Sequence, residues 1–138
     1  MAQSLEFPAD EIKTLSPLIL AHIGDSYFHL YIRTRLLQVT HNITRLHELS
    51  TQIVSATAQA KIYHAIENSL TDDERDIFRR GRNAKSHAPR KATVAEYHAS
   101  TGFEALLGDL FLRNNFTRLN EICEQAFKAA LANDFNDD

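Results

Sequence analysis

The stretch that decides the fold is His22-Ile23-Gly24-Asp25-Ser26-Tyr27-Phe28, which places a glycine and a carboxylate inside an apolar run. A second stretch, Thr101-Gly102-Phe103-Glu104-Ala105-Leu106-Leu107-Gly108, has the same character much later in the chain. Glycine lets another helix approach closely. A buried carboxylate without a partner costs several kcal/mol. The two stretches are therefore expected to form helices that meet, with Asp25 and Glu104 sharing one site.

The 138 residues predict a single domain, residues 1–138, with an acidic tail at 133–138 that is expected to be disordered. Hydrophobic residues make up 43% of the chain, which is enough for a core without disulfides. Cys123 is the one cysteine and is interpreted as a core residue, in keeping with a cytoplasmic location. No signal peptide or membrane-spanning stretch is predicted.

Helical periodicity dominates, and four glycines and three prolines interrupt it, so the fold class predicted is all-α. Ser16-Pro17 is a favourable helix start. Thr71-x-x-Glu74 and Thr93-x-x-Glu96 are capping boxes. The helices expected run over about 17–38, 44–69, 71–81, 94–113 and 117–132, with a loop at 82–92.

Spacing places Asp25 on the apolar stripe of its helix, with Phe28 and Ile32. Two carboxylates that meet repel each other unless a divalent cation such as Mg²⁺ lies between them. Spacing leaves the alternative open that Asp25 pairs with His22, His29 or Arg33, and that Glu104 pairs with a buried lysine or arginine. Carboxyl oxygens within about 5 Å of each other favour the metal site, whereas a bridging basic residue favours a structural pair.

Six of the 15 basic residues lie between positions 79 and 91, where there is no acidic residue, although the net charge of the chain is −3. This cluster predicts a local anionic partner. The alternative is a solvated basic loop.

Several motifs carry a resemblance to a known family. Ile23-Gly24-Asp25-Ser26 resembles the signature helix of the ribonuclease III family, and Phe103-Glu104-Ala105-Leu106-Leu107-Gly108 resembles its second helix. The Mini-ribonuclease III branch is closer. Its likeness rests on Val54-Ser55-Ala56-x-Ala58-Gln59-Ala60, on Arg80-Gly81-Arg82-Asn83-Ala84-Lys85-Ser86 and on Tyr97-x-x-Ser100-Thr101-Gly102-Phe103-Glu104.

The resemblance implies an all-helical ribonuclease III-type domain without a separate double-stranded-RNA-binding domain. It further implies a homodimer that cleaves double-stranded RNA with Mg²⁺, in maturation of large-subunit (23S) ribosomal RNA. Larger relatives carry further acids where this chain has Leu18, Ala21 and Thr101, and the Mini-III branch shares this change. Asp25 and Glu104 are therefore the carboxylates carried over as catalytic metal ligands.

The hypothesis is metal-assisted phosphodiester hydrolysis, with Asp25 and Glu104 holding Mg²⁺. Gln59 and Ser55 are expected to support packing near the site. The residues expected to contact RNA phosphates are Arg79, Arg80, Arg82, Asn83, Lys85, Ser86, Arg90 and Lys91. Two competing hypotheses are a non-catalytic helical RNA-binding module and a helical adaptor in which both carboxylates form buried ion pairs.

Overall fold

The computed structural model describes residues 6–84 and 92–134, and every regular element in these ranges is a helix. The elements in chain order are α1 (Ala9–Thr14), α2 (Pro17–Leu36), α3 (Ile43–Val54), α4 (Ala56–Ile66), a 3₁₀ turn (Glu67–Ser69), α5 (Asp72–Arg82), α6 (Val94–Leu112) and α7 (Phe116–Asp134). The all-α prediction is confirmed. Within the described ranges, no helix is both long enough and apolar enough to cross a membrane.

The predicted helix starts are present. The Ser16 hydroxyl accepts a hydrogen bond from the backbone N–H of Leu18, and Pro17 occupies the first position of α2. Both capping boxes form, at Thr71 with Glu74 and at Thr93 with Glu96. Local side-chain chemistry thus sets where α2, α5 and α6 begin.

One element differs from the prediction, because the continuous helix expected over about 44–69 is broken at Ser55. The backbone of Ser55 is extended, with φ −63° and ψ 155°, and its hydroxyl caps α4 by accepting from the N–H of Ala58 at 3.1 Å. Serine competes with helical hydrogen bonding in this way. The break leaves the Val54 carbonyl free to accept from the Gln59 side chain at 2.9 Å. Residues 67–69, also expected to be α-helical, form the 3₁₀ turn.

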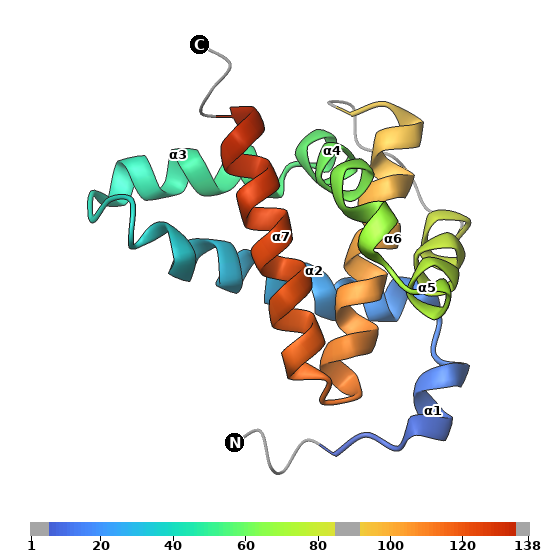
Figure 1. Ribbon diagram of the computed structural model, residues 1–138. Helices are drawn as coiled ribbons and strands as arrows, with labels where there is room; N and C mark the ends of the chain where they lie inside the picture. The colour runs from blue at the N-terminus through green and yellow to red at the C-terminus, as the bar shows by residue number, and fades with distance from the viewer. Residues whose placement is uncertain (1–5, 85–91, 135–138) are drawn as a thin grey trace.

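The core is built around the crossing of α2 and α6, and Figure 1 shows α2 passing behind α7 and α6. Phe28 of α2 and Phe103 of α6 are fully buried and pack edge to face, with ring centroids 5.3 Å apart. Most of the other buried side chains of α3, α4, α5 and α7 join the same cluster. The described residues therefore share one main core.

Two glycines allow α2 and α6 to touch backbone to backbone. A Cβ at Gly24 would overlap the carbonyl group of Glu104, and a Cβ at Gly108 would overlap the carbonyl group of Leu20. No larger residue fits at either position without separating the helices. This contact brings Asp25, which follows Gly24, close to Glu104.

Candidate active site

A cavity of about 410 Å³ opens beside the α2–α6 crossing, and both predicted carboxylates line it. Asp25 comes from α2 and Glu104 from α6, while Gln59 enters from α4. The prediction that two helices bring Asp25 and Glu104 together is confirmed. Their role as metal ligands stays a prediction.

Asp25 lies at the edge of the cavity rather than on the buried stripe of α2. Half of its side chain is exposed, and its Oδ1 lies 3.1 Å from Nε2 of His29, one helical turn further on. The placement expected from periodicity was wrong because α2 presents Gly24, the neighbouring residue, to α6. Of the partners considered from the sequence, His29 is the one that contacts Asp25.

Glu104 lies deeper, and its Oε2 accepts a hydrogen bond from Nε2 of Gln59 at 3.3 Å. Burial, and after it the Asp25 carboxyl within hydrogen-bonding reach, together raise the pKa of Glu104 to about 9, against a smaller opposing effect of Gln59. In the described part of the chain, no lysine or arginine forms an ion pair with Asp25 or Glu104. The buried ion pairs of the adaptor hypothesis are therefore not found there.

The convergence of these two carboxylates fits a hard divalent cation. Two acidic groups this close need a shared proton or a cation to offset their repulsion, and the raised pKa of Glu104 reflects first its burial and then the neighbouring Asp25 carboxyl. Mg²⁺ is commonly bound through one or two carboxylates, with waters and substrate phosphates completing its shell. Among the described residues, no group of three or more His, Cys, Asp or Glu side chains is placed to hold a metal. Asp25 and Glu104 are thus the residues that would hold it.

The three positions where larger relatives carry acids also lie at this cavity. Leu18, Ala21 and Thr101 all line it. The Thr101 hydroxyl donates to the backbone carbonyl of Tyr97 at 3.1 Å. The positions at which the resemblance implies acids in larger relatives therefore lie on the cavity wall, and in this chain none of the three carries a carboxylate.

Gln59 has a larger part in the site than the sequence predicted. Its side chain is 1% exposed, and its amide nitrogen contacts Glu104 directly. The sequence signal that could have identified Gln59 is its position as a glutamine among the small residues of the Val54–Ala60 motif. That signal did not identify the partner, because the contact depends on the helix break at Ser55.

The described part of the basic cluster lies at the C-terminal end of α5. Arg79, Arg80, Arg82 and Asn83 are exposed, and Arg79 pairs with Asp76 at 2.6 Å. Gly81 packs against Gly102 and the backbone of Thr101 on α6, and Thr101 also lines the carboxylate cavity, although no residue of α5 does. The remaining predicted RNA contacts, Lys85, Ser86, Arg90 and Lys91, lie outside the described residues.

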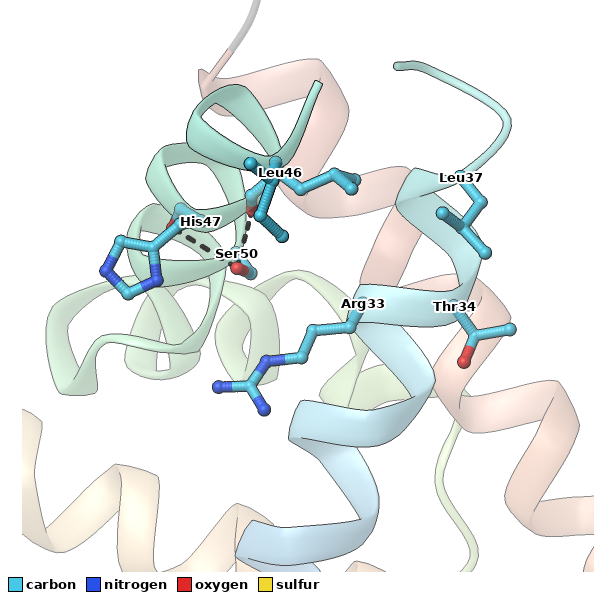
Figure 2. Close-up of a pocket in the computed structure, with 7 residues that line it drawn as sticks. Arg33, Thr34, Leu37, Leu46, His47 and Ser50 are labelled. Atoms are coloured by element: carbon cyan, nitrogen blue, oxygen red, sulfur yellow. Dashed lines mark hydrogen bonds between the residues drawn. The ribbon is translucent and has the colours of Figure 1, made fainter. Parts of the chain in front are cut away.

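A second cavity, of about 420 Å³, lies between the end of α2 and α3 (Figure 2). Its lining includes Arg33, Leu37, Ile43 and His47, but no carboxylate. The Ser50 hydroxyl inside it donates to the Leu46 carbonyl at 2.7 Å and so is already paired. This cavity therefore lacks the acidic ligands that the first cavity provides.

The fold and the cavity define a class of protein: an all-helical domain in which two acidic residues converge at a glycine-mediated helix crossing. The Ribonuclease III domain profile matches residues 18–115, and the chain belongs to this family. It is 48% identical over 115 residues to Mini-ribonuclease 3 of Symbiobacterium thermophilum, a match that covers 82% of this chain and 88% of that protein. It is 45% identical to Mini-ribonuclease 3 of a Thermoanaerobacter species, with 82% and 81% covered.

The fold is also similar to a solved structure. A crystal structure of a Fusobacterium nucleatum protein superposes with a TM-score of 0.76 and 34% sequence identity, and it covers 82% of this chain and 93% of that one. The ribonuclease III-type fold expected from the sequence is confirmed.

Proposed function

We propose that this ribonuclease III-family endoribonuclease cleaves double-stranded RNA with Mg²⁺, and that Asp25 and Glu104 are the metal ligands. The observation that carries the proposal is the pair of carboxylates converging at one open cavity, with no lysine or arginine of the described residues paired to either of them. The similarity to proteins named Mini-ribonuclease 3 supports the same activity.

The two carboxylates occupy different environments and have different roles in binding the metal. Glu104, held by Gln59, is the inner ligand, and it has to give up its proton before it can bind a cation. Asp25, half-exposed and oriented by His29, is the ligand next to solvent. A divalent cation bound there would stabilise the charge that develops on the scissile phosphate and lower the pKa of a water nucleophile.

RNA binding is assigned to the exposed basic end of α5 and to the segment that follows it. Arg80 and Arg82 flank Gly81, which packs against Gly102 of α6, so phosphates bound there would lie beside the helix that carries Glu104. Double-stranded RNA is recognised mainly through phosphates and 2′-hydroxyls. Lys85, Ser86, Arg90 and Lys91 would extend this surface.

We further infer that the protein acts in the cytoplasm as a homodimer on a ribosomal RNA precursor. Large apolar side chains are exposed around the end of α2 and the start of α3, including Leu30 at 65% and Ile43 at 77%. Leu37, labelled in Figure 2, lines the second cavity, and so does Ile43. A second copy of the chain would cover this apolar surface, and two carboxylate sites in one dimer would cut both strands.

The experiment is incubation of the protein with long double-stranded RNA and with single-stranded RNA of the same sequence, each with Mg²⁺ and with EDTA. Of these four incubations, only the one that contains double-stranded RNA and Mg²⁺ is expected to show cleavage. Binding of double-stranded RNA without cleavage at any Mg²⁺ concentration would instead support a non-catalytic RNA-binding module.

A further inference from the structure

Gln59 is a buried polar side chain with one half of its amide engaged and the other half free. Its Nε2 donates to the Val54 carbonyl at 2.9 Å and to Oε2 of Glu104 at 3.3 Å. Its Oε1 is buried and has no hydrogen-bond partner among the residues that the structure describes. The Val54 carbonyl can only accept, so the opposite orientation of the amide would lose that hydrogen bond.

The anchor for this side chain is the break between α3 and α4. In a continuous helix, the Val54 carbonyl would accept from a backbone N–H four residues later. Ser55 interrupts that pattern, and the side chain of Gln59 takes the free carbonyl instead. One N–H of the amide is thereby fixed to the backbone, and the other is directed at Glu104.

Stability alone does not explain this arrangement. A buried polar atom without a partner destabilises the fold by about 1–3 kcal/mol, and the unpaired Oε1 of Gln59 is such an atom. A glutamine that leaves Oε1 unpaired, yet contacts the inner carboxylate of the cavity, points to a role at that carboxylate.

We infer that Gln59 is a positioning residue, which holds the Glu104 carboxylate in the orientation that binds the metal. The inference rests on the proposed function, in which Asp25 and Glu104 are metal ligands. Side chains that hydrogen-bond to metal ligands set the ligands' orientation, and removing them typically lowers metal affinity about 10–100-fold.

The test is titration calorimetry of the RNA-free protein with Mn²⁺ and with Mg²⁺. Gln59→Met keeps the volume but removes the amide. Gln59→Asn keeps the amide but is one methylene too short to span Val54 and Glu104. Both variants should bind the metal about 10–100-fold more weakly than wild type. Their affinity for double-stranded RNA, measured without divalent metal, should match that of wild type.

The matched control is Gln125→Met, because Gln125 accepts a hydrogen bond from the Ser69 hydroxyl and lies away from the cavity. It should bind the metal as wild type does. Wild-type metal affinity in both Gln59 variants would overturn the inference. If Gln59→Met does not fold, the metal affinity of Gln59→Asn alone decides whether the inference stands. A wild-type protein that binds no metal, or that binds it no better than Asp25→Asn, would instead overturn the proposed function on which the inference rests.

Discussion

Replacing Gly24 by alanine should destabilise the protein, although alanine is the better helix former. At an open helical position, the change would stabilise the fold by about 1 kcal/mol. Here an added Cβ would overlap the Glu104 carbonyl oxygen, and it would lie 2.7 Å from the Glu104 carbonyl carbon and 2.8 Å from the Gly108 nitrogen, whereas ordinary contacts are 3.4–4 Å. These backbone atoms cannot rotate aside, so α2 and α6 have to separate within a close-packed core.

Overpacking of this kind costs about 1–3 kcal/mol. A clash with backbone atoms is expected to cost about 3 kcal/mol, the upper end of this range, because the backbone cannot move aside. After the helical gain of about 1 kcal/mol, the net loss is about 2 kcal/mol, or roughly 7 °C in the thermal midpoint. The assay is urea denaturation followed by circular dichroism. Ser26→Ala, an exposed change on the same helix, is the control and should stay within about 0.5 kcal/mol of wild type. Equal or greater stability of Gly24→Ala would refute the backbone contact between α2 and α6.

Three further predictions concern acid stability, RNA affinity and thiol reactivity. Hydrogen bonds from Arg35 and Tyr31 lower the pKa of Glu124 to about 2 from its ordinary 4.5, so this pairing stabilises the fold above pH 4.5 and is lost as the pH falls towards 2. The stability difference between wild type and Glu124→Gln should therefore shrink over that interval, and a constant difference would contradict the pairing. Arg80→Ala should reduce the slope of log affinity for double-stranded RNA against log salt by about 1. The control Arg45→Ala, on α3 and paired with Glu48, should leave that slope unchanged. An unchanged slope in Arg80→Ala would show that Arg80 does not contact the RNA. Burial raises the pKa of the Cys123 thiol to about 12, so the native protein should resist Ellman's reagent at pH 8 and react once unfolded, and rapid native labelling would contradict its burial.

Much of the fold could be predicted because its signals are local. Capping side chains at Ser16, Thr71 and Thr93 determine helix starts through contacts of two or three residues. The glycine–carboxylate pattern predicted the α2–α6 crossing because a glycine in an apolar helix favours close approach. Both kinds of signal depend on neighbouring residues in the chain, which a sequence shows directly.

The break at Ser55 and the depth of Asp25 depend on tertiary contacts instead. Ser50 and Ser55 lie in the same predicted helix, yet Ser50 bonds back to the Leu46 carbonyl inside α3 while Ser55 ends that helix and caps α4. Serine permits either outcome, and local sequence does not choose between them. Periodicity likewise placed Asp25 on the apolar stripe, whereas the helix crossing buries Gly24 and leaves Asp25 at the rim.

The most direct test of the proposed site is the single-turnover rate of double-stranded RNA cleavage at saturating Mg²⁺, for wild type and Asp25→Asn. Loss of a metal ligand removes several kcal/mol of transition-state stabilisation, so the rate should fall on the order of 10³-fold or more. Folding and RNA affinity should be retained, because Asp25 is half-exposed and lies outside the core. Asp25→Asn that cleaves RNA at the wild-type rate would contradict the assignment of Asp25 as a metal ligand.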